Sequence, residues 1–282
     1  MKIIITGVGL IGGSFARDLR NLFPQAGILG MDLNPDHLER SVKLGVIDGE
    51  AGPEDVAMAD LVIIAIPVDA AIKVVPEILE KVKDECLVID TGSTKFRLCE
   101  SLKDHSKRRN FLAAHPIAGT EYSGPEAAVT HLYQNKTLII CEVEKTAFKL
   151  QERAFEIFRQ LGMRIRYMDT RAHDKHIAYV SHLSHISSFM LGKTVLEKEK
   201  NERDIFDMAG SGFASTVRLA KSSPAMWTPI FKENRENVLE TLTEYIANLS
   251  HFQQLLEQNN FEEIYGEMER TNYIKTILKG IN

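Results

Sequence analysis

The chain has 282 residues, with 34 Lys plus Arg against 39 Asp plus Glu, a net charge of −5. This mild acidity offers no broad attraction to nucleic-acid phosphates or anionic lipids, so we expect neither as a partner. The longest apolar run, Leu61–Val68, is far shorter than the ~20 residues that cross a bilayer, so we expect no membrane span. Composition is 44% hydrophobic and 26% charged, typical of a folded protein, and the length predicts about two domains.

The cysteines indicate the redox compartment. Cys86, Cys99 and Cys141 are odd in number, far apart and form no C-x-x-C pair. We therefore expect reduced thiols, a cytoplasmic location, and neither a disulfide scaffold nor a cysteine-bound metal.

The first part of the chain alternates apolar, β-rich runs with segments of helical spacing. Thirteen of the eighteen glycines and seven of the nine prolines precede residue 163, as many short strands and turns require. The predicted strands are 2–6, 28–32, 61–66, 87–90, 111–114, 137–141 and 164–167, and the predicted helices between them include 11–22, 70–82 and 146–161. Near-continuous apolar strands separated by helices predict a mainly parallel, doubly wound sheet that helices cover on both faces.

The remainder of the chain reads as helix. Amphipathic segments are predicted over 171–200, 213–222, 224–231, 232–258 and 261–278, separated by Gly, Pro or Asn signals. The predicted fold class is therefore α/β, with a doubly wound sheet domain over residues 1–168 and an all-α domain over 169–282.

A glycine motif follows the first predicted strand and opens a helix. It reads Gly7-Val8-Gly9-Leu10-Ile11-Gly12, the G-x-G-x-x-G pattern of dinucleotide-binding turns. Gly7 permits the tight turn, Gly9 lets the backbone approach a pyrophosphate, and Gly12 lets helix and strand pack closely, while the helix N-terminus faces the anion. An accidental glycine turn is the alternative.

Asp32 ends the second strand, twenty residues after Gly12. Its carboxylate can accept hydrogen bonds from both adenosine ribose hydroxyls and would repel a 2′-phosphate, which favours NAD over NADP. Leu33, Asn34 and Pro35 add no cation for a phosphate. A turn acid at a strand end is the alternative interpretation.

Three residues follow strands at the edge where open α/β sheets bind ligands, namely Pro67, Ser93 and His115. His115 alone has an ordinary pKa, about 6.5, that lets it take a proton near neutral pH, and it is the best candidate base. A structural histidine before a proline turn is its alternative. Ser93 is either a hydrogen-bonding neighbour of the site or the N-cap of a helix over 95–102.

The helical part adds candidate substrate ligands. His182 and His185 are three residues apart and share a helix face, whereas His173 lies about half a turn out of phase with His182. A zinc pair lacks an accompanying Glu or Cys signature, and either histidine could be a core residue. Arg218 can grip a carboxylate through two hydrogen bonds, or it is an unpaired surface arginine.

At this point the sequence resembles the prephenate and arogenate dehydrogenases of tyrosine biosynthesis. The matching segments are Gly7–Ser14, Asp90–Lys95, His115–Glu121 and His182–His185, and H-P-I-A-G-T-E at 115–121 is the most specific of them. The resemblance implies a Rossmann domain, an NAD cofactor, and a helical domain that forms homodimers.

The resemblance also implies roles for individual residues. His115 would accept the hydrogen bond of the substrate's ring hydroxyl, with Ser93 in support as a second catalytic residue. His185 would face the substrate from the helical domain and Arg218 would hold its side-chain carboxylate. Thr120 and Glu121 would line the same pocket. The reaction would be oxidative decarboxylation of prephenate to 4-hydroxyphenylpyruvate.

One segment departs from the family pattern. Gly-Phe-Arg-Asp-Thr-Thr-Arg is common there, whereas this chain has Gly212–Arg218 with Ala214-Ser215 in place of Arg-Asp. No obvious extra acid lies next to Arg218 to hold the ammonium of arogenate, so we expect prephenate rather than arogenate. Two other readings stay open: a β-hydroxyacid dehydrogenase, which would need a catalytic lysine where this chain has His182 and His185, and an NAD-binding sensor without catalysis.

Overall fold

The computed structural model describes residues 1–200, 202 and 204–279, which form two compact units, Met1–Arg235 and Glu236–Asn282. The predicted boundary after residue 168 falls inside the first unit and stays a prediction. The predicted second domain, 169–282, also includes residues 201, 203 and 280–282, which lie outside the described residues. Across the described ranges, no helix has both the length and the apolar character of a membrane span.

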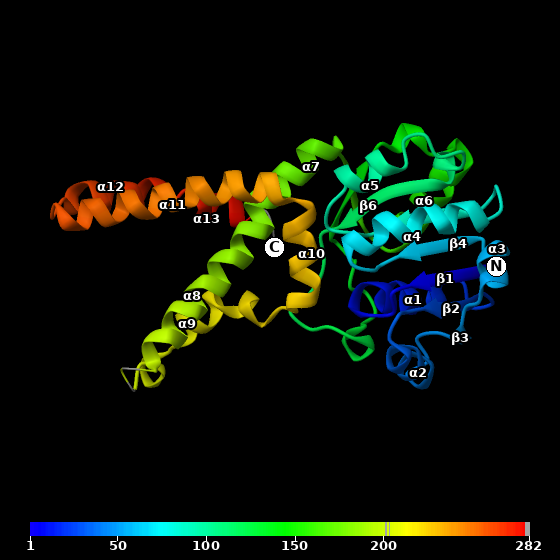
Figure 1. The fold of residues 1–282 in the computed structure, drawn as a ribbon, viewed down its shortest axis with the longest axis horizontal. Coiled ribbons are helices and arrows are strands. Elements are labelled where there is room, and N and C mark those ends of the chain that lie inside the picture. The colour runs from blue at the N-terminus through cyan, green and yellow to red at the C-terminus, as the bar shows by residue number, and fades with distance from the viewer. Residues whose placement is uncertain (201, 203, 280–282) are drawn as a thin grey trace. The chain divides into compact units, whose positions relative to one another are not determined.

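The first unit contains one eight-stranded sheet (Figure 1) in the order β3-β2-β1-β4-β5-β6-β7-β8. Strands β1 to β6 run parallel, β7 runs antiparallel to β6, and β8 is parallel to β7. The strands are β1 Lys2–Thr6, β2 Gly27–Met31, β3 Gly49–Glu50, β4 Leu61–Ile64, β5 Leu87–Asp90, β6 Phe111–Pro116, β7 Thr137–Cys141 and β8 Arg164–Tyr167. The predicted mainly parallel sheet is confirmed, with the strand order of a Rossmann fold over β1–β6.

Helices cover both faces of this sheet, because its central strands are apolar on both sides. One core cluster joins the sheet to α1 (Leu10–Leu22), α2 (Pro35–Lys43) and α6 (Phe148–Gln160). The other joins it to α3 (Pro53–Ala57), α4 (Val68–Lys81) and α5 (Phe96–Ser101). The predicted Rossmann-type sheet domain is therefore confirmed.

Several strand ends differ from the prediction. The strand expected over 28–32 occupies Gly27–Met31, and the one expected over 61–66 ends at Ile64. The strand expected over 111–114 continues to Pro116, because β7 pairs with it antiparallel and places Ile139 opposite His115. His115 is therefore a paired residue near the end of β6 and does not follow the strand.

The helix predicted over 171–200 is interrupted. It consists of α7 (Thr170–Ile177), a π turn (Ala178–His182) and α8 (Leu183–Glu199). π turns inside α-helices are frequent at functional sites. The segment predicted over 213–222 is also split, into α9 (Ser211–Thr216) and a 3-10 turn at Arg218–Lys221, and α10 (Pro224–Glu233) follows.

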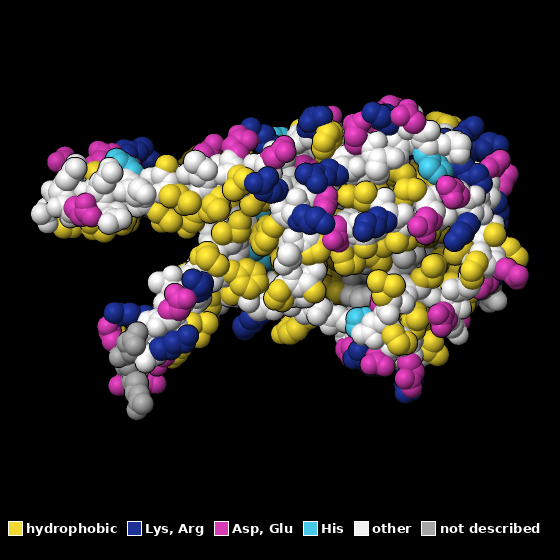
Figure 2. Space-filling model, in the orientation of Figure 1, with side chains coloured by type: hydrophobic (Ala, Val, Ile, Leu, Met, Phe, Trp, Pro, Cys, Tyr) yellow, Lys and Arg dark blue, Asp and Glu magenta, His cyan; other side chains and the backbone are white. Residues whose placement is uncertain are grey.

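The second unit is helical. It holds most of α11 (Arg235–Glu257), together with α12 (Phe261–Thr271) and α13 (Ile274–Leu278), so the helix predicted over 261–278 is divided in two. Large apolar side chains are exposed on it, among them Ile246, Leu249, Phe252, Leu256, Phe261, Tyr265 and Met268. In Figure 2, apolar side chains gather along one side of α11 and α12.

Candidate active site

The glycine turn has the backbone that its sequence predicts. Gly7 has a φ of +88°, and a Cβ there would lie 2.3 Å from the Ala65 carbonyl oxygen. A Cβ on Gly12 would lie 2.0 Å from the Gly7 carbonyl oxygen, so close packing requires glycine at both positions. A Cβ on Gly9 would meet only the Gly124 nitrogen, at 4.0 Å. The open space in front of Gly9, at the N-terminus of α1 where Leu10 and Ile11 begin the helix, fits the pyrophosphate of a dinucleotide.

Asp32 lies beside this turn, directly after β2. Its carboxylate accepts hydrogen bonds from the backbone N–H groups of Val8 and Asn34, at 3.1 and 2.9 Å. His37 Nδ1 lies 3.5 Å from the same carboxylate. The carboxylate is thus held beside the glycine turn, and its remaining lone pairs suit the hydroxyls of an unphosphorylated ribose.

The strand order turns back between β1 and β4, where such sheets bind their ligands. Gly7 follows β1, and Pro67 follows β4 as the exposed N-cap residue of α4. Both therefore lie at the carboxyl edge of adjacent parallel strands, as predicted.

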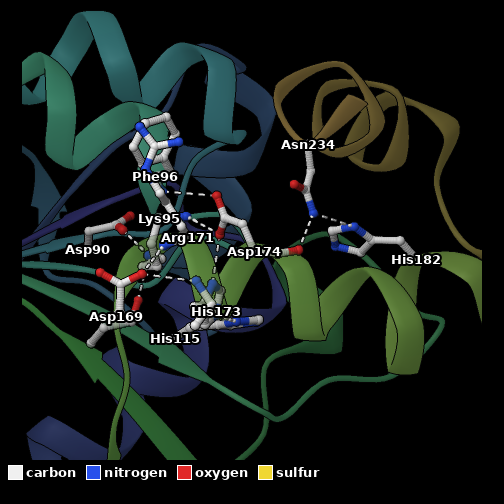
Figure 3. Close-up of polar contacts among 12 residues, drawn as sticks. Asp90, Lys95, Phe96, His115, Asp169, Arg171, His173, Asp174, His182 and Asn234 are labelled. Atoms are coloured by element: carbon white, nitrogen blue, oxygen red, sulfur yellow. Dashed lines mark hydrogen bonds and ion pairs between the residues drawn. The ribbon is translucent and has the colours of Figure 1, made fainter. Parts of the chain in front are cut away.

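His115 is at the same edge, near the end of β6, with 8% of its surface exposed. Its Nδ1 lies 2.9 Å from Nε2 of His173, which α7 contributes (Figure 3). Burial, and then the neighbouring His173, lower the pKa of His115 well below its usual value. The imidazole is therefore neutral near pH 7 and able to accept a proton.

Asp174 continues the chain of contacts. One of its carboxylate oxygens lies 2.7 Å from His173 Nδ1 and accepts the backbone N–H of Lys95 at 2.8 Å. The other oxygen accepts the backbone N–H of Phe96 at 2.9 Å. Asp174 thereby ties α7 to the start of α5. Burial lowers the pKa of His173, although Asp174 opposes the shift.

An ion pair is buried beside these imidazoles. The ammonium of Lys95, which is fully buried, pairs with Asp90 at the end of β5 and donates to the Ala114 carbonyl oxygen of β6 at 2.7 Å. This pair cross-links the ends of the two strands that carry the site. Its positive charge also contributes to the lowered pKa of His115.

Ser93 is half-buried in the loop between β5 and α5. The N-cap interpretation of Ser93 is wrong, since α5 begins at Phe96 with Lys95 as its N-cap residue and no side-chain cap. Within the described residues, no hydrogen bond joins Ser93 to His115. Its contribution to catalysis stays a prediction.

His185 projects from the first turn of α8. Its Nδ1 lies 2.9 Å from the Ser181 carbonyl oxygen, and its ring stacks on the buried Trp227 of α10 with ring centroids 3.5 Å apart. Trp227 packs in turn against Val68 at the start of α4. His185 is thus connected through Trp227 to the carboxyl edge of β4. Burial lowers the pKa of His185.

His182 is a fully buried residue of the π turn. Its Nδ1 lies 3.1 Å from the amide nitrogen of Asn234, and burial lowers its pKa to about 4. The core interpretation of His182 therefore agrees with its surroundings. Among the described residues, there is no group of three or more His, Cys, Asp or Glu side chains that could hold a metal ion.

Arg218 lies on the 3-10 turn after α9 rather than on the predicted helix. Its guanidinium forms an ion pair with Glu121 at 3.0 Å, so the interpretation of Arg218 as an unpaired surface residue is wrong. The same contact shows that our expectation of no acid near Arg218 is wrong. The neighbouring sequence could not reveal this acid, because Glu121 is 97 residues away in the chain. A hydrogen bond from its own backbone N–H and the Arg218 charge hold the pKa of Glu121 below its usual range.

The turn that carries Arg218 is fixed to α8 despite the substituted Ala214-Ser215. Ser188 Oγ donates to the Thr216 carbonyl oxygen and accepts the Ala220 N–H, both at 3.1 Å. Thr120 is exposed on the loop after β6, where its hydroxyl accepts the Tyr122 N–H. Ser188 thus holds the turn through the last residue of α9 and through Ala220, and Glu121 holds the Arg218 side chain.

Comparisons with known proteins identify the family of this chain. The model for the nucleotide-binding domain of prephenate dehydrogenase matches residues 15–167, and the model for the dimerization domain of that enzyme matches residues 169–270. The chain belongs to the prephenate dehydrogenase family. The sequence resemblance is therefore confirmed.

Similar proteins of the family have both sequence and structure in common with this chain. A Bacillus subtilis prephenate dehydrogenase is 30% identical over 93% of this chain and 72% of its own length. A Zymomonas mobilis cyclohexadienyl dehydrogenase is 28% identical over 98% and 96%. The crystal structure of Aquifex aeolicus prephenate dehydrogenase in complex with hydroxyphenyl propionate and NAD+ superposes with a TM-score of 0.88 at 32% identity, and covers 100% of this chain and 98% of its own.

Proposed function

We propose that the chain catalyses the NAD-dependent oxidative decarboxylation of prephenate to 4-hydroxyphenylpyruvate. The observation that carries the proposal is the neutral, buried imidazole of His115 at the carboxyl edge of the sheet that bears the dinucleotide turn. Membership of the prephenate dehydrogenase family supports the same reaction.

The proposed mechanism assigns one task to each side chain. His115 accepts the proton of the ring hydroxyl while the carbon that bears it loses a hydride. NAD, when bound, accepts that hydride. The electron pair of the ring–carboxylate bond then passes into the ring, carbon dioxide leaves, and the ring becomes aromatic as its oxygen regains the proton. Arg218 binds the side-chain carboxylate of the substrate, and His185 contacts the substrate from the first turn of α8.

The cofactor is proposed to be NAD rather than NADP. Asp32 supports this choice, because its carboxylate, which Val8 and Asn34 hold beside the glycine turn, would repel a 2′-phosphate. The open space at Gly9 supports a dinucleotide in general.

A direct assay tests the reaction. Absorbance of reduced nicotinamide is followed with prephenate and with arogenate, each with NAD and with NADP. We expect turnover with prephenate and NAD and at least tenfold lower kcat/KM with NADP. No turnover with either acid would contradict the proposed function and favour a binding protein without catalysis.

Arogenate is a second candidate because of Glu121. Arogenate carries an ammonium where prephenate carries a keto group, and the Glu121 carboxylate lies beside the proposed carboxylate ligand Arg218. If arogenate is the substrate, Glu121→Gln raises its KM at least tenfold and leaves the KM for prephenate within threefold. If prephenate is the substrate, the variant has no such selective effect.

We infer that the protein acts as a homodimer. The match to a dimerization domain over 169–270 and the exposed apolar side of α11 and α12 support this state. Sedimentation of the intact protein tests it, with Leu249→Asp expected to yield monomers. Asn248→Asp is the matched control, since it places the same charge one residue away, off the apolar row. A monomeric wild-type protein would contradict the inference.

A further inference from the structure

The geometry points to His173 and Asp174 as positioning residues that fix the proton of His115 on Nδ1 and leave its Nε2 free to accept the substrate's hydroxyl proton. The inference rests on the proposed function, in which His115 is the base. It deepens that function, because it says which nitrogen acts and what orients it.

Asp174 sets the direction of the contacts. Its two oxygens face the backbone N–H groups of Lys95 and Phe96, which can only donate. With both oxygens accepting from backbone donors, the carboxylate form, which offers acceptors only, is the form that fits these contacts. His173 Nδ1, 2.7 Å from the same carboxylate, must therefore carry a hydrogen and donate it.

The donor and acceptor roles at His173 then determine those at His115. A neutral His173 with its hydrogen on Nδ1 has an acceptor at Nε2. His115 Nδ1 lies 2.9 Å from that nitrogen, so it must be the donor of the pair. The hydrogen of neutral His115 is thus on Nδ1, and its lone pair is on Nε2.

The surroundings keep this arrangement in place. His173 and Asp174 have exposures of 2% and 3%, so water does not compete for their hydrogen bonds. The Lys95 ammonium, held by Asp90 and by the carbonyl oxygen of Ala114 next to His115, is buried near both imidazoles. A positive charge there disfavours a second proton on the imidazole pair before substrate binds.

The order of contacts also gives the proton a path. When His115 Nε2 takes the hydroxyl proton, the imidazolium donates more strongly through Nδ1 to His173, whose own hydrogen faces the Asp174 carboxylate. A buried carboxylate that orients a base histidine can be worth a factor of about 10⁴ in turnover. Here one imidazole stands between the two groups.

The nitrogen-15 NMR spectrum of histidine-labelled, wild-type protein tests the inference without substrate. At pH 7.5 we expect His115 and His173 each to show a protonated Nδ1 and an unprotonated Nε2. His115→Asn and His173→Gln assign the signals. A His115 signal with the hydrogen on Nε2 would overturn the inference, whether or not the protein turns over prephenate.

Substitutions of His173 give the kinetic test. His173→Phe keeps the volume but offers no acceptor, so we expect at least a tenfold lower kcat, a KM within threefold and unchanged NAD binding. His173→Gln restores an acceptor opposite His115, and we expect it to recover at least threefold over Phe. Equal rates for wild type and the Phe variant would contradict the inference.

The matched control is Thr146→Val. It removes a buried hydrogen bond, 2.7 Å long, to the Phe111 carbonyl oxygen on the same strand as His115, without touching the imidazoles. We expect its kcat to stay within threefold of wild type. If His173→Phe does not fold, the wild-type spectrum and the Gln variant still decide. An inactive wild-type protein would contradict the proposed function alone.

Discussion

His185 lies nearly flat on Trp227, with the ring centroids 3.5 Å apart and the ring planes at 26°. The indole fixes the plane of the imidazole, while the Ser181 carbonyl oxygen fixes its Nδ1. A stacked aromatic pair is worth about 0.5 to 1.5 kcal/mol beyond the area it buries. The stack therefore fixes the orientation of the His185 ring, which we propose contacts the substrate.

Trp227→Leu should raise KM by about two- to tenfold, the factor that corresponds to the loss of the stack. Trp227→Phe retains an aromatic face and should stay within twofold of wild type. Steady-state kinetics with thermal unfolding as the folding control measure both. Equal KM values for Leu and Phe would show that the stack does not position His185.

His115→Asn should lower kcat by about 10²- to 10⁴-fold, the usual contribution of a positioned base, with a modest change in KM. His131→Asn is the matched control, because His131 is exposed and its φ of 60° suits asparagine. Turnover of His115→Asn within threefold of wild type would remove His115 from the chemistry.

Arg218→Ala should raise the KM for prephenate by at least about tenfold, since it removes the proposed carboxylate ligand and leaves the Glu121 charge without its partner. The side chain of Arg218 is 51% exposed, so solvent screening keeps the effect below that of a buried charge. Lys221→Ala, on the same 3-10 turn, is the control. An unchanged KM would mean that another group holds the acid.

The glycines of the turn should separate cofactor binding from folding. Gly9→Ala places its Cβ in open space, so we expect unfolding temperature to change little while the Kd for NAD rises at least tenfold. Gly12→Ala clashes with the Gly7 carbonyl oxygen and should destabilise the fold by about 1 to 3 kcal/mol. Calorimetry of both variants, with and without NAD, measures the two effects. Tight NAD binding by Gly9→Ala would contradict the assignment of the pyrophosphate site.

The free energy of unfolding should decrease as the pH is lowered below 7, because the folded protein contains buried, neutral histidines. His182 has a pKa of about 4 in the folded protein and about 6.5 in the unfolded chain, so only the unfolded chain binds its proton between those values. The stabilisation is complete above pH 6.5 and is lost by about 1.4 kcal/mol per pH unit as the pH falls toward 4. His115 and His173 shift in the same direction. Urea unfolding at pH 7, 6 and 5 should show a shallower loss for His182→Gln, and an equal loss would contradict this origin.

Much of the sheet was predictable because its strands are short apolar runs between turn residues. Leu87–Asp90, Thr137–Cys141 and Arg164–Tyr167 match their predicted bounds. Gly49–Glu50 was not predicted, since a two-residue strand has no periodicity to detect. The π turn at Ala178–His182 was not predicted either, because the spacing of apolar residues across it is the same as in one continuous helix.

The contacts that join His115 to His173, Asp174 and Lys95 were not predicted from the sequence, for a different reason. His173 is 58 residues from His115, and Asp174 is 79 residues from Lys95. His173, Asp174 and Lys95 are each unremarkable in their own segments, and only the docking of α7 on α5 brings them together with His115, the residue that the sequence did single out. Lys95 and Asp90 are the last and first residues of the family segment Asp90–Lys95. Their closeness in sequence was the only feature that could have predicted the buried ion pair between them.

Because Asp174 closes the N-terminus of α5, the orientation of the base belongs to two separate stretches of the chain at once. A fragment that stops at residue 168 would keep the nucleotide turn yet lose the partner that orients its imidazole. Exchange of helical segments between relatives would meet the same constraint: a chimera needs the imidazole, the carboxylate and the receiving amides from one parent, or it will hold its coenzyme and leave its substrate unchanged.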